Sequence, residues 1–519
     1  MREKKPAAKR ARAKKPAGPK DGRRFYSRPL SRRNYDGGNT GTRTSGWTTP
    51  STDANAPINK NLVYLRNRSH DLSRNSPYGQ KAVDSSIYEM LGTGLRPVLD
   101  TGDEVLDRQA LDVWDAWGRV CYPSSPLGIY GFEALTAMGW FEGGEALCRR
   151  ISMPWAEMPG LPRLMLDLYE GDLMPLDKTE AIPGGKILHG IEFDTYNRRN
   201  AYHLYRVHPG ATDIVSVTKD RWSTVRIPAV DMIHLYRETR PGQVRGTPRP
   251  ASVIQALYDA DSYADSERVR AARASNLVGV ASGGDAESSY GGTQVSGMGD
   301  AAEDGQGGWL VDGNGNPVED ITAGSVFRVQ SGQDFKLSVP SAANGYESTR
   351  RCDLRDIAAG YGLSYEVLTG DLSQQNFAAI RLGLNQQHLL FRALREHVFI
   401  PFVMDPIWRW FLAAAQAAGL LPDDPRLNAV GWSQPQVQAI DRAADVEAAV
   451  KSMRAGLSAL SDEHAALGKD SDAVLSAIAK SQSACDKLGI VTDSDPRQTS
   501  SGGQMQPTWA APGEVPPVV

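Results

Sequence analysis

The sequence has few cysteines: four among 519 residues. They are dispersed along the chain, at Cys121, Cys148, Cys352 and Cys485. No two of them have the spacing of a zinc knuckle, and four isolated thiols do not make a disulfide framework. The composition therefore excludes a small disulfide-stapled scaffold and a cysteine-based zinc site, and it fits a reducing cytoplasm.

Short catalytic motifs are also missing. The sequence has no H-E-x-x-H, no G-x-S-x-G and no G-x-G-x-x-G at the start of a helix, and Gly184-Gly185-Lys186 lacks the rest of a phosphate-binding loop. The histidine pairs His203/His208 and His388/His397 have no acidic neighbours at metal-binding spacing. We therefore expect no enzyme, no metal and no cofactor. A nuclease site made of carboxylates alone has no short signature and stays open as an alternative.

Long hydrophobic runs suited to a membrane are absent. The most apolar stretch, 399–421, contains Pro401, Asp405 and Arg409, which a bilayer core would penalise. The basic N-terminus is not followed by an apolar segment, so we expect no secretory signal. The sequence predicts neither a membrane span nor a membrane partner.

Charge is distributed unevenly. The formal net charge is -3, but residues 1–35 carry fourteen Lys and Arg against two acidic residues, and the rest of the chain has a net charge of -15. Few aliphatic residues occur before residue 60, so 1–59 is predicted to be a disordered basic arm. Such an arm binds nucleic acid or an acidic partner non-specifically, or serves only as a solvated tail. Its first basic residues are Lys4, Lys5, Lys9, Arg10, Arg12, Lys14 and Lys15.

Hydrophobic periodicity predicts an α+β protein that is mainly helical. Helical spacing occurs after Asn59, again over 105–150, and over 251–276, and Ser76-Pro77 and Gly92 or Gly94 mark the two ends of a helix. Between 163 and 237 short β-branched and aromatic runs predict a small antiparallel unit.

The second half begins with a Gly/Ser-rich loop, 281–308, and two strands are predicted around an Asn-Gly-Asn turn within 309–329. Three helical blocks follow, 345–361, 374–418 and 433–489. Ser433 to Gln436 has the form of a capping box, Gly489 suits a helix end, and 491–519 is predicted to be a flexible tail.

The predicted helix from Phe377 to Val398 has two stripes. One is apolar, and the other consists of Arg381, His388, Arg392 and Arg395. The simpler interpretation is a core face and a solvated face. The alternative is that the basic stripe lies against an acidic neighbour in a ring.

A polar loop over 369–376 precedes this helix. Asp371 or Ser373 suits a helix N-cap. Alternatively, Ser373, Gln374, Gln375 and Asn376 touch a phosphate backbone weakly without trapping it.

Five collinear stretches carry a resemblance to a known family. They are RNRSHDLSRNSPYGQKAVDSSIYEMLGTGLRP, 191–210, 227–272, 354–383 and 458–490, and the most telling parts are RPGQVRG (Arg240 to Gly246) and GLSYEVLTGD (Gly362 to Asp371). In these stretches the chain resembles the lambda-type portal proteins of tailed bacteriophages.

The resemblance implies an elongated subunit that assembles into a ring of about twelve copies at one capsid vertex. Double-stranded DNA passes through such a ring when the terminase large subunit packages it, and again on ejection. Head–tail connector, major capsid and scaffold proteins are the other implied partners. The implied locations are the virion and, during assembly, the host cytoplasm.

The family topology divides the chain into named parts. The implied parts are a wing (60–250), a first stem helix (251–276), a clip (277–344), a second stem helix (345–361), a tunnel loop (362–376), a long wing helix and connection (377–432) and a crown (433–490). The DNA-facing tunnel loop would include Asp371, Ser373, Gln374, Gln375 and Asn376. Candidate intersubunit or channel charges are Asp259, Asp265, Arg268, Arg270, Arg381, Arg392 and Arg395.

One alternative is a monomeric or weakly oligomeric structural adaptor whose basic arm binds nucleic acid. It predicts that no ring forms and that deletion of 1–35 abolishes nucleic-acid binding. A metal-dependent nuclease predicts divalent-dependent DNA cleavage that is lost when carboxylates are substituted. The five collinear stretches favour the portal interpretation, which needs no catalytic motif.

Overall fold

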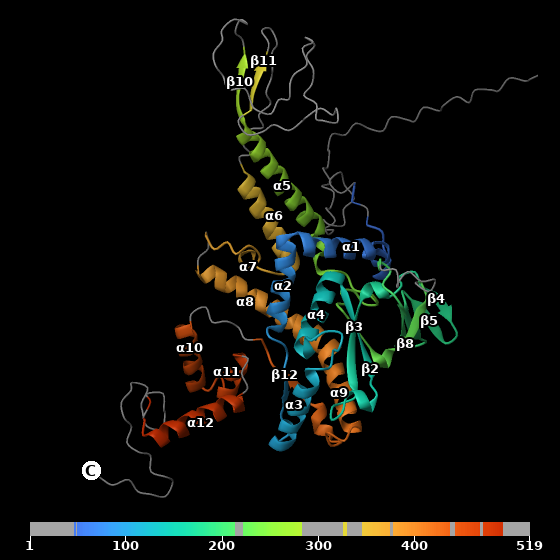
Figure 1. Ribbon diagram of the computed structural model, residues 1–519, viewed down its shortest axis with the longest axis vertical. Coiled ribbons are helices and arrows are strands. Elements are labelled where there is room, and N and C mark those ends of the chain that lie inside the picture. Colours follow the sequence, from blue (N-terminus) through green and yellow to red (C-terminus); the bar gives the residue numbers. More distant parts are fainter. Residues whose placement is uncertain are drawn as a thin grey trace, which may run out of the picture. The chain divides into compact units, whose positions relative to one another are not determined.

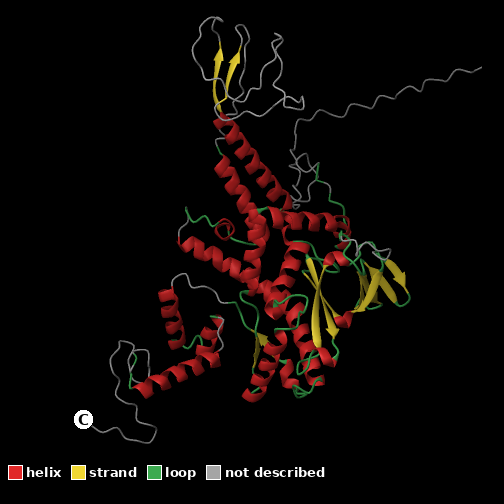
Figure 2. Ribbon diagram, viewed as in Figure 1, coloured by secondary structure: helices red, strands yellow, loops and turns green. Residues whose placement is uncertain are grey.

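The computed structural model describes residues 46–47, 49–212, 222–282, 325–329, 345–373, 377–435, 442–467, 471–490 and 492. The chain divides into two units, Met1–Thr52 and Asp53–Val519. Residues 1–45 and 48 of the predicted basic arm, 283–308 of the Gly/Ser-rich loop and all of the C-terminal tail but residue 492 lie outside the described residues. The predicted disorder is wrong at 55–59, because these residues begin the first helix. The helices and strands below all belong to the second unit (Figures 1 and 2).

The first two helices are α1 (Asn55–Asn75) and α2 (Pro77–Leu91). Ser76 separates them because its backbone is extended and its side chain accepts a hydrogen bond from the Gly79 amide at 3.3 Å. Gly92 ends α2 with φ 59°, a conformation that suits glycine. The predicted helix boundaries at Ser76-Pro77 and Gly92 are confirmed.

The next pair is α3 (Glu104–Gly118) and α4 (Gly128–Gly143). Asp103 caps α3 through hydrogen bonds from the amides of Val105 and Leu106. The prediction of helix as far as residue 150 is wrong, because β2 occupies Glu145–Ser152. Gly144 ends α4 in the left-handed region, and a Cβ there would lie 2.3 Å from the Thr247 carbonyl carbon, so only glycine fits this turn.

Two antiparallel sheets follow, as the strand-rich texture predicts. The first has the order β3-β2-β9, with β3 at Leu164–Glu170 and β9 at Met232–Tyr236. The second has the order β4-β5-β6-β7-β8. Its strands are β4 (Glu180–Ile182), β5 (Gly185–Leu188), β6 (Ile191–Asp194), β7 (Arg199–Tyr205) and β8 (Thr224–Pro228).

Two long helices, α5 (Ile254–Asn276) and α6 (Tyr346–Tyr361), lie side by side (Figure 1). Arg350 on α6 donates to the Ala260 carbonyl and lies 3.3 Å from the Asp261 carboxylate on α5. Beyond α5, β10 (Leu277–Ser282) pairs in parallel with β11 (Ser325–Val329). Most of the predicted hairpin over 309–329 lies outside the described residues, and its last five residues form β11.

The predicted helical block 374–418 is a continuous helical path with a change of winding. It runs through α8 (Phe377–Leu394), the π-helix η7 (Arg395–Met404) and α9 (Asp405–Ala417). Pro401 lies inside η7, where it has no amide to donate. Residues 379–417 are long and apolar enough to cross a membrane by length and composition, but half of the most apolar window is buried. The side chains of Trp408 and Phe411 are part of the core.

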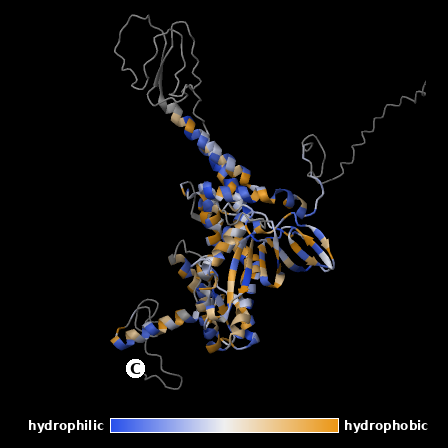
Figure 3. Cartoon of the chain, turned by 45° about the vertical axis from the view of Figure 1, so that its right-hand side comes forward, coloured by the Kyte–Doolittle hydropathy of each residue, from blue (hydrophilic) through white to orange (hydrophobic). Residues whose placement is uncertain are grey.

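Aromatic side chains mark the centre of the largest core. The Trp114 ring centroid lies 5.1 Å from that of Trp117, 5.2 Å from Trp408 and 5.0 Å from Phe411. Helices α3 and α9, which are distant in sequence, therefore meet through their apolar faces. Figure 3 shows the hydrophobic residues concentrated in the helices and strands around this core.

The chain then returns to its first half through a short strand pair. β12 (Val430–Trp432) pairs antiparallel with β1 (Pro97–Leu99), and Ser433 exchanges two 2.8 Å hydrogen bonds with Arg96. Ser433 is therefore extended and starts no helix, and Gln436, the last residue of the predicted capping box, lies outside the described residues. Three helices follow: α10 (Arg442–Arg454), α11 (Leu460–Ala466) and α12 (Ser471–Leu488). Gly489, with φ 67°, follows α12 as predicted.

Five short 3₁₀ turns and one short α-helix complete the described part of the chain. The turns are Trp155–Glu157, Gly171–Leu173, Ala229–Asp231, Arg249–Ser252 and Pro425–Asn428. The helix, α7, spans Tyr365–Thr369, between α6 and α8.

Candidate nucleic-acid interface

The GLSYEVLTGD run folds into a tight connection between α6 and α8. Gly362 adopts φ 81° and ends α6, and the Leu363 amide donates to the Ala358 carbonyl at 2.9 Å. Ser364 then starts α7 by accepting from the Val367 amide, while its own amide donates to Gln387 Oε1 at 2.9 Å. The Gln387 side chain on α8 thus holds the first residue before α7 in place.

Asp371 organises the turn after α7. Its Oδ1 accepts from the Ser373 amide at 3.0 Å and from the Ser373 hydroxyl at 2.6 Å, and its Oδ2 accepts from the Tyr365 hydroxyl at 3.1 Å. The hydrogen bonds from Ser373, with that from Tyr365, lower the pKa of Asp371. Asp371 therefore caps its own turn in the charged form, and α8 begins only at Phe377.

The other side chains predicted for this loop are Gln374, Gln375 and Asn376, and they lie outside the described residues. The residue between the two polar groups of the turn, Leu372, is 61% exposed. The described part of the loop therefore presents an ionised carboxylate, a hydroxyl and an apolar side chain.

The candidate charges on α5 lie on its surface. Asp259, Asp265 and Arg268 are exposed. Asp259 accepts from Gln255 at 2.9 Å, one helical turn earlier. Arg270 pairs with Glu267 at 2.7 Å on the same helix. The structure of this one chain does not bring these four groups together into a single site.

The basic stripe predicted on α8 is divided among different surroundings. Arg381 pairs with Asp445 of α10 at 2.8 Å, and His388 contacts Glu89 of α2. Arg392 is exposed. Arg395 is only 4% exposed and donates to the Met90 carbonyl at 3.1 Å. The prediction of a continuous exposed stripe is therefore wrong at Arg395, because this side chain is buried and donates its hydrogen bond to Met90 at the start of η7.

A buried charge network, which the sequence reasoning missed, holds α1, β2 and β9 together. At its centre the carboxylate of Glu145 is fully buried and contacts the guanidinium groups of Arg66 and Arg245. It also accepts from His234 Nε2 at 3.0 Å and from the Gly246 amide at 3.0 Å. These five residues are called the Glu145 network below.

The charge states of the network follow from burial and pairing. Burial opposes ionisation of Glu145, but Arg245 and Arg66 hold its pKa well below its usual range. Burial lowers the pKa of His234 to about 4, so its ring is neutral at pH 7 and donates from Nε2. A buried carboxylate balanced by two arginines is a structural device that is costly to break.

The RPGQVRG run supplies the arginine and the turn that this network needs. Arg245 donates further hydrogen bonds to the carbonyls of Gly171, Met174 and His189. A Cβ on Gly246 would lie 1.9 Å from the Gly144 carbonyl oxygen, so a side chain at Gly246 has no room. The motif therefore joins the two sheets to the helices by specific contacts.

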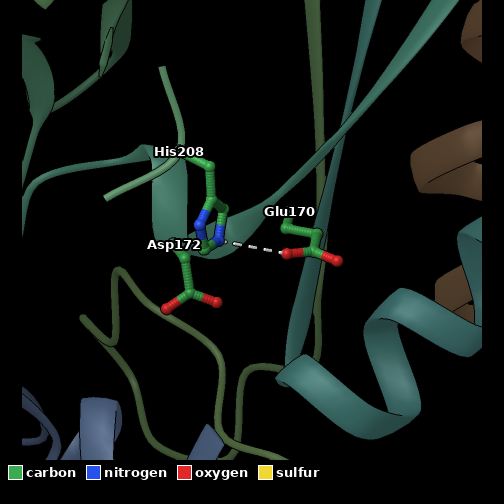
Figure 4. A group of neighbouring side chains, drawn as sticks. All are labelled: Glu170, Asp172 and His208. Atoms are coloured by element: carbon green, nitrogen blue, oxygen red, sulfur yellow. Dashed lines mark ion pairs between the residues drawn. The ribbon is translucent and has the colours of Figure 1, made fainter. Parts of the chain in front are cut away.

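Glu170, Asp172 and His208 gather beside this network, with ligand atoms within 4.8 Å of one another (Figure 4). His208 Nε2 lies 3.3 Å from the Glu170 carboxylate, while its Nδ1 accepts from the Gly210 amide at 3.0 Å. An Nδ1 that accepts places the neutral ring's proton on Nε2, so His208 directs a hydrogen, not a lone pair, at the carboxylate. Asp172 is also 3.5 Å from the Arg66 guanidinium. This geometry favours a hydrogen bond from His208 to Glu170 beside the Arg66–Asp172 ion pair over a metal centre.

Comparison with known proteins gives a consistent set of relatives. The model of the family described as phage portal protein, lambda family, matches residues 40–395. A probable portal protein of Halomonas phage phiHAP-1 is 24% identical over 458 residues, which cover 84% of this chain and 83% of that protein. The portal protein of Escherichia phage N15 is 29% identical over 157 residues, covering 28% of each chain.

Chains from gene transfer agent particles are among the solved structures with detectable likeness. One chain, from the virion of a native particle, has 15% identity and a TM-score of 0.40, with 79% of this chain and 93% of that chain covered. Another, from the neck of a native particle computed with C12 symmetry, has 14% identity, a TM-score of 0.40, and 79% and 94% coverage.

The fold is thus α+β, mainly helical with small antiparallel sheets, and the two most specific sequence motifs are the GLSYEVLTGD connection and the RPGQVRG turn. The family match covers most of the chain and includes both motifs. The chain belongs to the lambda family of phage portal proteins.

Proposed function

We propose that this chain is the non-enzymatic subunit of a ring at one capsid vertex, through which double-stranded DNA is packaged by the terminase and later ejected. About twelve copies form the ring, and head–tail connector proteins dock onto it. The observation that carries the proposal is the family match over residues 40–395. The ring acts in the virion and assembles in the host cytoplasm with capsid and scaffold proteins.

The parts of the subunit follow the family order. The sheets and α1 to α4 form the wing, α5 and α6 form the stem, and the chain between them, which includes β10 and β11, forms the clip. Residues 362–376 form the tunnel loop, and α10 to α12 form the crown. The side-by-side packing of α5 and α6, fixed by Arg350, supports their assignment as a paired stem.

In this proposal the tunnel loop guides DNA without binding it tightly. Asp371 is held in its charged form by Ser373 and Tyr365, so each subunit presents a fixed negative charge near the loop tip. Like charge repels the phosphate backbone and keeps the duplex centred, and the exposed Leu372 offers no ionic bond. DNA can then slide past with no deep binding minimum.

The first test is the assembly state of the purified protein, by native mass spectrometry and negative-stain imaging. Rings with a central hole are expected. If the protein stays monomeric even when co-expressed with capsid and scaffold proteins, and if deletion of residues 1–35 abolishes its nucleic-acid binding, the portal function is wrong and the adaptor is correct.

The second test reverses the loop charge. Asp371→Lys should leave ring formation intact and slow DNA packaging, because a ring of lysines attracts phosphate, and higher salt should partly restore the rate. Asp103→Lys, which also replaces a capping aspartate, exposed at the start of α3, is the matched control and should package normally. Packaging by Asp371→Lys at the control rate at every salt concentration would refute a guiding role for the loop.

A further inference from the structure

The C-terminal helices α10 to α12 lack a core of their own. Of the side chains described between 443 and 490, none is buried. Leu457 is 82% exposed and Leu488 is 73% exposed. The exposed apolar set is Val446, Leu457, Leu460, Leu467, Leu475, Ile478, Leu488 and Ile490.

Helices α10 and α11 are too short to be stable without a partner, and the longer α12 has no buried side chain among its described residues. α10 has 13 residues, α11 has 7 and α12 has 18. Isolated helices shorter than about 15 residues are marginal in water, and most helical stability in proteins comes from packing an apolar face. The exposed ion pair between Arg381 and Asp445, which joins α8 to α10, contributes at most about 1 kcal/mol.

The size of the exposed apolar set indicates a protein interface. Together, these eight residues expose as much surface as between four and five fully exposed apolar residues would. At about 100 Å² for each, that is roughly 450 Å² per copy and about 900 Å² for two facing copies. A specific interface buries about 1,000 Å² or more, so burial of the apolar set and its polar rim reaches that size.

The charges on α12 favour a second copy of the same chain. α12 carries Asp472 and Asp486 against Lys480 and Lys487, a net charge of zero. Two copies of such a helix do not repel each other, whereas nucleic acid and an anionic membrane surface both select for excess positive charge. Figure 3 shows hydrophobic and hydrophilic residues alternating along α12, so apolar and charged contacts can form together.

We propose that helices α10 to α12 become stably folded only when the same helices of an adjacent copy cover their apolar side chains, so that assembly orders these helices. The proposal rests on the proposed ring and adds a regulatory step to it. A free subunit presents loosely folded α10 to α12, and a closed ring presents a rigid helical surface. A partner that binds this surface would then distinguish assembled rings from free subunits.

Hydrogen exchange measured by mass spectrometry on free subunits and on purified rings tests this directly. Exchange of residues 442–490 should slow by about 100-fold or more on ring formation. Residues 77–91, which form the core helix α2, should be protected in both states. Equal protection of 442–490 in free subunits and rings would overturn the inference.

A matched pair of variants separates the apolar contact from general effects of charge. Leu475→Glu with Ile478→Glu places two carboxylates in the exposed apolar set of α12. Ser476→Glu with Ser483→Glu adds the same charge at exposed positions on the side of the helix away from Leu475, Ile478 and Leu488. The first variant should lose the assembly-dependent protection, and the second should keep it. Equal behaviour of the two would refute the apolar contact.

Failure of this inference and failure of the portal function are distinguishable. Rings whose residues 442–490 exchange as fast as those of free subunits refute the inference alone. Protection that appears only after a capsid or connector protein is added also refutes it, because the occupant is then not a second copy. Absence of rings under every condition refutes the portal function.

Discussion

Removing the charge of Glu145 should destabilise the subunit strongly. Glu145→Gln keeps the size of the side chain but leaves the buried guanidinium groups of Arg66 and Arg245 without their carboxylate. It also turns an amide NH₂ toward groups that are themselves donors. Breaking a buried ion pair by removing one partner costs about 3–5 kcal/mol, a large part of the 5–15 kcal/mol that stabilises a typical domain.

The assay is urea unfolding followed by tryptophan fluorescence, which reports on the buried rings of Trp114, Trp117 and Trp408. With a slope of about 3 kcal/mol per molar urea, the midpoint should fall by about 1 M or more. The control is Glu347→Gln, which removes the charge from an exposed i,i+4 pair with Arg351. This control should change stability by no more than about 0.5 kcal/mol.

A double-mutant cycle identifies the cause. Arg66→Met alone leaves Glu145 with one arginine, whereas Arg66→Met combined with Glu145→Gln removes both members of the pair. The free energy of unfolding of the double variant should therefore fall by at least about 1 kcal/mol less than the sum of the decreases in the two single variants. If Glu145→Gln is within about 1 kcal/mol of Glu347→Gln, the network does not stabilise the fold as argued.

Three further predictions address other parts of the structure. Gly246→Ala should give little soluble protein, because the new Cβ would clash with the Gly144 carbonyl oxygen. The control, Gly242→Ala, has open space around it and should lower the free energy of unfolding by only about 1–2 kcal/mol, because Gly242 has φ 82°. Soluble yield and thermal melting compare the two variants. The pKa of His234 is about 4 in the folded protein and near 6.5 in the unfolded chain, so the unfolded chain binds more protons between these pH values. The free energy of unfolding should therefore fall as the pH drops from about 6.5 to 4. In His234→Gln the urea midpoint should not show this contribution to the pH dependence. Tyr365→Phe removes the hydroxyl that donates a hydrogen bond to Asp371, which should destabilise the turn by about 1 kcal/mol. Hydrogen exchange at residues 370–373 should then be faster. Unchanged exchange at these residues would contradict the described hydrogen bond.

Local chemistry made several features predictable from the sequence. Ser76-Pro77 and Gly92 act within one helical turn, so the ends of α2 could be read directly. The same local reasoning predicts a helix through Glu145, where the structure has a strand. Local sequence could not show the turn at Gly144, because that turn depends on a contact with Thr247, about 100 residues away. The apolar stripe of α8 was visible in its spacing, but spacing alone could not show that Arg395 points inward to Met90.

The Glu145 network lay beyond sequence reasoning for a related reason. Glu145 meets Arg66, His234 and Arg245 across 79, 89 and 100 residues of chain. A single glutamate near an apolar strand carries no local sign of these partners. The RPGQVRG run is recognisable from its resemblance to the family, whereas its physical role depends on the contacts of Arg245 and Gly246 with the Glu145 carboxylate.

The π-helical winding of η7 determines where the chain tolerates a change in length. Because its hydrogen bonds span five residues instead of four, this segment holds more residues per turn than α8 or α9. Deleting one residue within 395–404 can therefore convert a wide turn into an ordinary α-helical one while the helices on both sides keep their faces. The same deletion at the start of α9 would rotate everything beyond it by about 100° and turn Trp408 and Phe411 away from Trp114. Length variation among related chains should accordingly concentrate in η7.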